Sequence, residues 1–132
     1  MMGRRTYEAM SAVWPNTTAV LCTRDDEVPK VVFSKTLTGA EWQESRIVSG
    51  NLAEDVEQLK GEPAGLILAH GDATFIDALI AGRLIDEYRL VIHPVAIGHG
   101  TRLFSALREP LRLDLTEART FPSGPRSAST DH

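Results

Sequence analysis

Three short segments combine glycine, hydroxyl and cationic residues in a way that suits phosphate groups. They are Gly3-Arg4-Arg5-Thr6, Ser34-Lys35-Thr36 and His70-Gly71-Asp72-Ala73-Thr74. The first opens a predicted helix, the second ends a predicted strand, and the third joins a predicted strand to a predicted helix. Free amides at a helix start attract anions, glycine lets them approach, and Arg or Lys adds full charge. Together the segments indicate a nucleotide with several phosphates, and the cationic residues would suit a 2′-phosphate.

Each segment alone also has a plainer interpretation, as an ordinary helix start, a loop and a turn. Asp72 places a carboxylate where a phosphate should lie, which is unfavourable unless that carboxylate caps the helix sideways. Neither G-x-G-x-x-G nor G-x-x-x-x-G-K-[ST] occurs, so the sequence supports neither a Rossmann fingerprint nor a P-loop. The nucleotide hypothesis therefore depends on the three segments occurring together.

No residue stands out as the catalytic one, and the catalytic residue stays unknown at this stage. Several side chains could donate a proton, and each is also explained as a structural or surface residue: His70, Asp86, Glu87, His93 and His99. Arg102, Arg108 and Arg112 could form a basic face for a phosphorylated substrate, although scattered surface arginine is the commoner explanation. No His pair at helical spacing and no Cys pair suggests a metal, and no G-x-S-x-G suggests a hydrolase.

The elements that must position these segments alternate between helices and strands. We predict helices over 6–14, over 51–60 with Asn51 as N-cap and Gly61 as a left-handed C-cap, and over 73–81 ended by Gly82. We predict strands over 19–22, 30–34, 46–48, 66–70, 88–93 and 111–115. The apolar strand over 66–70 should be covered on both faces, and the alternating one over 111–115 should be antiparallel. This alternation favours an α/β layered domain with a largely parallel sheet.

Composition narrows the class of protein further. The chain has 132 residues with 18 acidic and 14 basic side chains, a formal charge of -4, which argues against a general nucleic-acid binder. It has no apolar run of the roughly 20 residues that span a membrane. The start carries no secretory signal, and one cysteine, Cys22, excludes an internal disulfide, so we expect a cytoplasmic protein. The segment 122–132 lacks Val, Ile, Leu, Met and aromatic residues, and we expect it to be a disordered tail.

The order of these motifs from Gly3 to about Gly124 resembles the dihydrofolate-reductase-like superfamily. The branch it resembles is the reductase domain of the riboflavin-biosynthesis bifunctional deaminase–reductase. The motifs that carry the resemblance are Gly3–Glu8 with Trp14-Pro15, Val31–Leu37, His70–Phe75, Asp86–Leu90, His93–Val95, Gly98–Gly100 and Leu103-Phe104. The resemblance implies one domain over residues 1–121 with a three-layer α/β fold, in which helices cover both faces of a mostly parallel mixed sheet.

The resemblance also implies a function. Members are NADPH-dependent reductases that usually form homodimers and act on a pterin-like or ribosylaminopyrimidine ring, as in dihydrofolate reductase or 5-amino-6-(5-phosphoribosylamino)uracil reductase. By position, Gly3, Arg4, Arg5 and Thr6 would face the cofactor phosphates, and Ser34, Lys35 and Thr36 the 2′-phosphate end. Gly71, Ala73 and Thr74 would hold the pyrophosphate, together with Asp72, where the family more often has Gly or Ser.

The sequence departs from the family pattern at both ends. Members normally begin with an additional strand that carries a Ser-Leu-Asp-Gly-like segment and normally end with an apolar closing strand. Here the sequence begins at Met1, and Phe121-Pro122-Ser123-Gly124 leads into polar residues, so we expect both strands to be missing. This expectation leaves two alternatives to the reductase, an NADP(H)-binding domain without turnover and a purely structural dimerisation unit.

Overall fold

The protein divides into two compact units, Met1–Ile76 and Asp77–His132, with the division inside helix α4 (Ala73–Ala81). The structure, a computed structural model, describes residues 1–16, 28–63, 65–122 and 124–131. The strand predicted over 19–22 and the residue Cys22 lie outside these ranges. Among the described residues no helix is long and apolar enough to cross a membrane.

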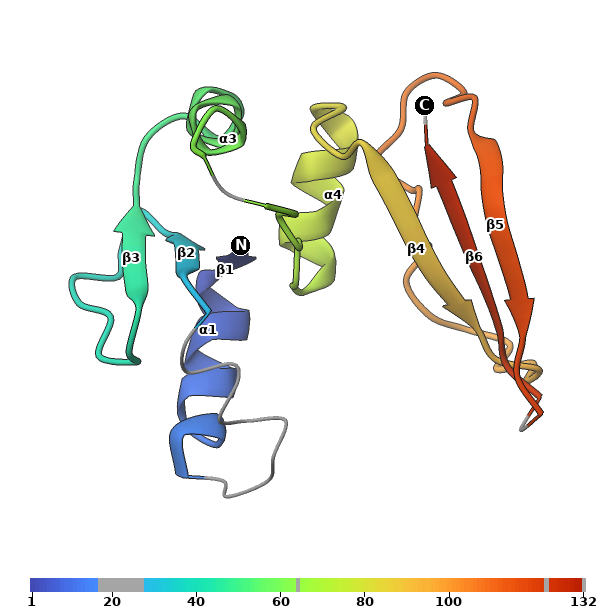
Figure 1. The fold of residues 1–132 in the computed structure, drawn as a ribbon, viewed down its shortest axis with the longest axis horizontal. Helices are drawn as coiled ribbons and strands as arrows, with labels where there is room; N and C mark the ends of the chain where they lie inside the picture. Colours follow the sequence, from blue (N-terminus) through green and yellow to red (C-terminus); the bar gives the residue numbers. More distant parts are fainter. Residues whose placement is uncertain (17–27, 64, 123, 132) are drawn as a thin grey trace. The chain divides into compact units, whose positions relative to one another are not determined.

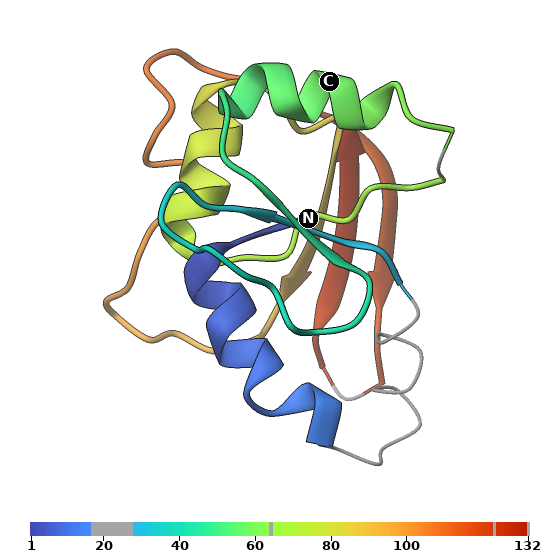
Figure 2. The same cartoon turned by 90° about the vertical axis from the view of Figure 1, so that its left-hand side faces the viewer.

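The first unit contains a parallel sheet of β1 (Met2–Gly3), β2 (Lys30–Phe33) and β3 (Ser45–Val48), in that order (Figures 1 and 2). Gly3 is the register partner of Phe33, and Phe33 is the partner of Val48. The carboxyl ends of all these strands therefore lie at one edge of the sheet. The strands predicted over 30–34 and 46–48 are confirmed, whereas the short β1 was not predicted.

Residues 66–70 lie beside β1 but do not form the predicted strand. The amino group of Met1 donates to the Leu68 carbonyl at 2.6 Å, and the His70 amide donates to the Met1 carbonyl at 2.8 Å. Leu66 is 72% exposed and Leu68 63% exposed, so the prediction of a strand covered on both faces is wrong. Residues 66–70 form no strand because β1, the neighbouring strand, has only 2 residues and offers few backbone groups for pairing. Burial lowers the pKa of the Met1 amino group.

Helix α1 (Arg4–Ser11) follows β1 directly, and a 3-10 turn covers Trp14–Asn16. Its apolar side chains pack into a core: Tyr7 is buried in a cluster with Met2, Val32 and Trp42, and Met10 and Trp14 pack against that cluster. The Trp42 amide donates to the Tyr7 hydroxyl at 3.0 Å. This core fixes α1 against the sheet, so that the position of its first turn follows from the burial of Tyr7.

Helix α3 (Leu52–Lys60) begins as its sequence predicts. The Asn51 side chain accepts hydrogen bonds from the amides of Ala53 and Glu54, which confirms it as the N-cap. Val56 and Leu59 are buried. The prediction of a left-handed C-cap is wrong, because Gly61 has a φ of -78° and its amide stays within hydrogen-bonding reach of carbonyls in the last helical turn.

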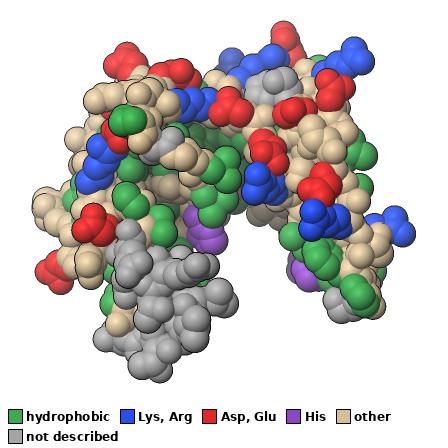
Figure 3. All heavy atoms as spheres, viewed as in Figure 1, with side chains coloured by type: hydrophobic (Ala, Val, Ile, Leu, Met, Phe, Trp, Pro, Cys, Tyr) green, Lys and Arg blue, Asp and Glu red, His purple; other side chains and the backbone are tan. Residues whose placement is uncertain are grey.

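The second unit contains an antiparallel sheet in which β6 (Arg126–Asp131) lies between β4 (Glu87–Ile92) and β5 (Asp114–Thr120) (Figure 1). The predicted disordered tail over 122–132 is therefore wrong for residues 126–131. These residues are held by backbone pairing with a strand on each side rather than by burial of apolar side chains. Glu87–Arg89 and Glu117–Arg119 form exposed ion pairs, and acidic and basic side chains are interspersed over this unit in Figure 3.

The remaining predictions for the second unit differ in detail. The strand predicted over 88–93 is confirmed as β4. The strand predicted over 111–115 is antiparallel as expected but begins at Asp114, so residues 111–113 lie outside it. Helix α4 ends near Gly82 as predicted, although the left-handed residue is Arg83, with a φ of 53°. The Leu84 amide donates to the Leu79 carbonyl and the Arg83 amide to the Ile80 carbonyl, which is the pattern of a Schellman motif.

The described residues thus form a mixed α/β structure with one parallel and one antiparallel sheet. The α/β class is confirmed. A three-layer arrangement with helices on both faces, and a single domain over residues 1–121, stay predictions.

Candidate functional site

The carboxyl ends of β1 and β2 bring the first two predicted segments together. Because Gly3 and Phe33 are register partners in a parallel pair, Arg4 and Ser34 leave the sheet from neighbouring positions. Arg4 and Arg5 begin α1 and are exposed, and Lys35 and the adjacent Thr36 are exposed in the loop that follows β2. Cationic side chains that follow β1 and β2 therefore lie at the same edge of the sheet.

The third segment is tied to the first by a side-chain hydrogen bond. The amide of Asp72 donates to the Thr6 hydroxyl oxygen at 3.0 Å, across 66 positions of sequence. The His70 amide also bonds to the Met1 carbonyl, immediately before β1. All three predicted segments consequently lie along one edge of the first unit.

Phe75 explains why glycine occurs in two of these segments. A Cβ atom on Gly3 would lie 3.1 Å from the Phe75 Cβ, and one on Gly71 would lie 2.9 Å from the Phe75 Cδ1. Phe75 is 8% exposed, and the centroid of its ring lies 5.5 Å from that of Phe33. The sequence gives no sign of this role, because nothing in the local pattern around Phe75 shows contact with two distant glycines.

The start of α1 is open. Its N-cap, Gly3, has extended backbone angles and supplies no side-chain hydrogen bond, and the first turn contains no acidic residue. Arg4 lies 3.8 Å from Glu8 in an exposed i,i+4 pair, which leaves its guanidinium accessible. First-turn amides without a side-chain cap, next to two guanidinium groups, favour an anion.

The start of α4 is closed by its own carboxylate. Asp72 Oδ1 accepts a hydrogen bond from the Phe75 amide at 3.1 Å, so Asp72 caps the helix sideways, as its position required. The Ile76 amide bonds to the Asp72 carbonyl, which begins the helical pattern. The amides of Ala73 and Thr74 precede the first intrahelical bond and remain as donors for a ligand. The Asp72 charge next to them opposes a phosphate.

Ser34 shapes the loop after β2. Its hydroxyl oxygen accepts hydrogen bonds from the amides of Thr36 at 3.2 Å and Leu37 at 2.9 Å, and its own amide donates to the Val48 carbonyl at 2.9 Å. The hydroxyl therefore holds the turn that presents Lys35. The contact of Ser34 with a ligand, expected from the resemblance, is limited to its remaining hydroxyl proton.

The candidate proton donors belong to both units. His70 is exposed in the first unit, and His93 and His99 are exposed in loops of the second unit. A hydrogen bond from Arg89 lowers the pKa of Glu87, which makes Glu87 a poor proton donor. Arg102, Arg108 and Arg112 are all exposed. In the part of the chain that the structure describes, no three His, Cys, Asp or Glu residues lie close enough to hold a metal ion. None of these residues gains a catalytic role from its placement.

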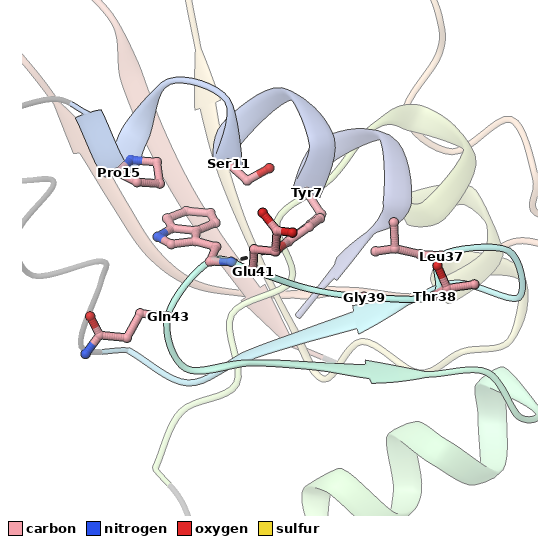
Figure 4. A pocket seen from close by; sticks show the side chains of 9 residues that line it. Tyr7, Ser11, Pro15, Leu37, Thr38, Gly39, Glu41 and Gln43 are labelled. Carbon is pink, nitrogen blue, oxygen red and sulfur yellow. Dashed lines mark hydrogen bonds between the residues drawn. The ribbon is translucent and has the colours of Figure 1, made fainter.

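A hollow of about 730 Å³ lies against α1 in the first unit, and the sequence did not predict it (Figure 4). Its lining residues come from α1, the turn after it and the loop after β2: Tyr7, Ser11, Pro15, Leu37, Thr38, Gly39, Glu41, Trp42 and Gln43. None of the predicted cofactor-binding residues is among them. Glu41 supplies the charge in this lining and it is negative, so the hollow does not suit phosphate.

Comparison with known proteins agrees with the motifs and the fold. Residues 1–125 match the family model of the RibD C-terminal domain. The chain belongs to this family. The resemblance inferred from the sequence, to the dihydrofolate-reductase-like superfamily and its riboflavin-biosynthesis branch, is thereby confirmed. The cofactor contacts that the resemblance implies stay predictions.

The chain is also similar to the uncharacterized protein YyaP of Bacillus subtilis (strain 168), with 38% identity over 95 residues, which are 72% of this chain. The chain spans about half, 50%, of the length of that relative.

Two solved structures share the fold. A putative riboflavin biosynthesis protein from Shewanella sp. PV-4 matches with a TM-score of 0.75 and 20% identity, over 98% of this chain and 71% of that one. A pyrimidine reductase-like protein from Corynebacterium diphtheriae matches with a TM-score of 0.64 and 14% identity, over 98% and 73%. At these identities the similarity shows the fold alone.

Proposed function

We propose that this chain is an NADPH-dependent reductase domain that transfers hydride to a pterin-like or ribosylaminopyrimidine substrate. Membership of the RibD C-terminal domain family supports a reductase-type function in broad terms. The name of the Corynebacterium structure, a pyrimidine reductase-like protein, supports the class of substrate. The identity of the cofactor and its place on the chain are argued from the residues below.

One observation carries the proposal: the three predicted phosphate-binding segments lie along a single edge. Gly3 pairs with Phe33 in the sheet, and Thr6 bonds to the amide of Asp72. The edge offers open amides at the start of α1 and cations from two elements, Arg4 and Lys35. A dinucleotide with a diphosphate and a 2′-phosphate needs several such anion-binding positions spread along one surface.

The residues fit the phosphates of NADPH, with one exception. Arg4, Arg5 and the first-turn amides of α1 would hold the diphosphate, and Lys35 with Thr36 would hold the 2′-phosphate. Ala73 and Thr74 would add amide donors. The exception is Asp72, whose carboxylate repels phosphate while it caps α4. When bound, NADPH supplies the hydride. The residues of the chain bind the cofactor, neutralise its charge and orient it.

Titration of the full chain with NADPH and NADH tests this assignment. NADPH at about 100 times its Kd should raise the free energy of unfolding by about 2.7 kcal/mol. Lys35→Ala should weaken NADPH by about tenfold or more, the value of a lost charge-assisted hydrogen bond, and weaken NADH much less. Arg4→Ala should weaken both nucleotides to a similar extent, because both carry the diphosphate. Arg119→Ala, at an exposed arginine of the second unit, is the matched control. Equal losses of NADPH and NADH in Lys35→Ala would contradict the 2′-phosphate assignment.

Turnover is tested separately from binding. NADPH absorbance is followed with dihydrofolate and with 5-amino-6-(5-phosphoribosylamino)uracil as substrates. Oxidation with either ring supports the reductase, whereas tight NADPH binding with no oxidation would favour the alternative of an NADP(H)-binding domain without turnover. The homodimer and the cytoplasmic location stay predictions, and light scattering of the full chain measures the first of them.

A further inference from the structure

Thr6 and Asp72, two of the predicted phosphate ligands, are already engaged with each other. We infer that Thr6, Asp72 and Phe75 act as positioning residues: they form a latch that holds the start of α4 against the start of α1. The latch is a property of the free protein. Its effect on cofactor binding rests on the proposed function.

The polar half of the latch consists of two hydrogen bonds that share Asp72. The Asp72 amide donates to Thr6 Oγ1 at 3.0 Å, and the Phe75 amide donates to Asp72 Oδ1 at 3.1 Å. Asp72 thus links α1 through its backbone and caps α4 through its side chain. Both bonds are partly buried, so breaking one of them leaves a polar group without its partner.

The apolar half of the latch is Phe75. Its ring and Cβ fill the space beside the Cα atoms of Gly3 and Gly71, within 3.1 Å and 2.9 Å of where their Cβ atoms would be. Phe33, at the end of β2, packs against the same ring at 5.5 Å between centroids. Phe75 therefore holds α1, α4 and the sheet edge at one spacing.

The two halves are reciprocal. Gly3 and Thr6 are the N-cap and third residue of α1, and Asp72 and Phe75 are the N-cap and third residue of α4. The third residue of each helix contacts the N-cap of the other: Thr6 bonds to the Asp72 amide, and Phe75 packs on the Gly3 Cα. Neither helix start can shift along its axis without breaking one of these contacts.

The residues between each N-cap and third position are left for a ligand. These are Arg4-Arg5 in α1 and Ala73-Thr74 in α4, whose amides lie in the first turn, where no intrahelical bond uses them. A latch that fixes the two pairs relative to each other pre-organises them for a ligand that spans both helix starts. Thr6 and Asp72 contribute by fixing that spacing.

Hydrogen exchange on the free, full chain tests the latch without any cofactor. Thr6→Val keeps the shape of the side chain and removes the acceptor, whereas Thr6→Ser keeps the acceptor. Thr6→Val should speed exchange of the Asp72 amide by about tenfold, since that amide loses its hydrogen bond, and Thr6→Ser should stay near the wild-type rate. Unchanged Asp72 protection in Thr6→Val would overturn the inference.

The matched control is Thr116→Val in the second unit. Thr116 Oγ1 donates to the Ser129 carbonyl at 2.9 Å, so this variant also loses a threonine hydroxyl hydrogen bond. This variant should leave the exchange rate of the Asp72 amide at the wild-type value. The Val32 amide in β2 should exchange at the wild-type rate in every variant. If Thr6→Val does not fold, Phe75→Leu is the second variant, which removes the ring and should also speed Asp72 exchange.

Binding measurements with two nucleotides distinguish a positioning role of Thr6 from direct contact with the cofactor. In the proposed binding mode NADPH would span both helix starts, whereas adenosine 2′,5′-bisphosphate is a shorter probe that lacks the second half of the diphosphate. Thr6→Val should weaken NADPH by about tenfold and the shorter probe by less than about twofold, with recovery in Thr6→Ser. Equal weakening of both probes would make Thr6 a direct ligand and overturn its positioning role. If the wild-type chain binds neither probe, the proposed function fails and the exchange result alone decides the latch.

Discussion

The starts of α1 and α4 lie at the same edge of the first unit, yet they differ in charge and in capping. Gly3 leaves α1 without a side-chain cap, and Arg4 and Arg5 follow with no acid in the first turn. Asp72 caps α4 with its own carboxylate. On physical grounds the N-cap residue and the charges of the first turn decide how well a helix start suits a phosphate, and these differ between α1 and α4.

The start of α3 supports this view. It follows β3 at the same edge, but Asn51 caps it and Glu54 and Asp55 occupy its first turn. Two of these three helix starts therefore carry negative charge where a phosphate would approach. The positive charge of the edge is concentrated at α1 and at Lys35, and the proposed cofactor must be held mainly there.

Reversing the charge at the open helix start should have the largest effect. Arg4→Glu replaces a cation by an anion beside uncapped amides, and we expect NADPH to bind about a hundredfold more weakly in a calorimetric titration. Glu8→Gln is the control, because it removes the acidic partner 3.8 Å from Arg4 and should leave binding within about twofold of wild type or slightly tighter. An Arg4→Glu chain that binds NADPH normally would show that α1 is not the phosphate site.

Filling the contact between the two starts should have the next largest effect, on stability. Gly71→Ala brings a methyl group to 2.9 Å from the Phe75 ring and should lower the free energy of unfolding in urea by about 2 kcal/mol. Gly3→Ala, whose methyl group would lie 3.1 Å from the Phe75 Cβ, should lower the free energy of unfolding by less. The double variant Gly71→Ala, Phe75→Leu should lose less free energy of unfolding than the two single variants lose in sum. Strict additivity would mean that Gly71 and Phe75 do not pack against each other as described.

A change at the other end of α4 tests whether the difference lies in the helix starts. Arg83 has a φ of 53°, a left-handed conformation that glycine adopts more easily. Arg83→Gly should therefore raise the free energy of unfolding by about 1 kcal/mol, measured in urea, and leave NADPH affinity unchanged. A lower stability would indicate that the Arg83 side chain stabilises the fold by more than its backbone strain costs.

The smallest expected effect comes from the charge of Asp72, which distinguishes the start of α4 from that of α1. Asp72→Asn keeps an efficient N-cap and removes the negative charge, so we expect NADPH to bind about threefold more tightly with nearly unchanged stability. Asp72→Ala, which also removes the cap, should cost about 1 kcal/mol in urea unfolding. Weaker NADPH binding in Asp72→Asn would show that the carboxylate helps the cofactor rather than opposing it.

Local patterns predicted much of the fold. The cap at Asn51, the strands β2 and β3 and helix α4 follow from side chains within a few residues of each other. The strand β6 could not be predicted, because its residues are polar and small and it is held by backbone pairing with β4 and β5. Residues 66–70 mislead in the opposite direction, since their apolar side chains indicate a buried strand and Leu66 and Leu68 are exposed.

The candidate site was predicted as three segments, and not as an arrangement. Glycine, hydroxyl and cationic residues at element ends are visible in the sequence. The hydrogen bond between Thr6 and Asp72 joins positions 66 apart, and the packing of Phe75 on Gly3 depends on β1 lying beside residues 66–70. Such contacts between distant segments leave no local pattern, so the latch could be found only in the structure.

An NMR titration of the full chain with NADPH tests the central claim most directly. We predict that backbone amide signals shift together for Arg4 to Thr6, for Lys35 and Thr36, and for Gly71 to Thr74. Shifts confined to the hollow lined by Tyr7, Glu41 and Trp42, or to residues of the second unit, would contradict it.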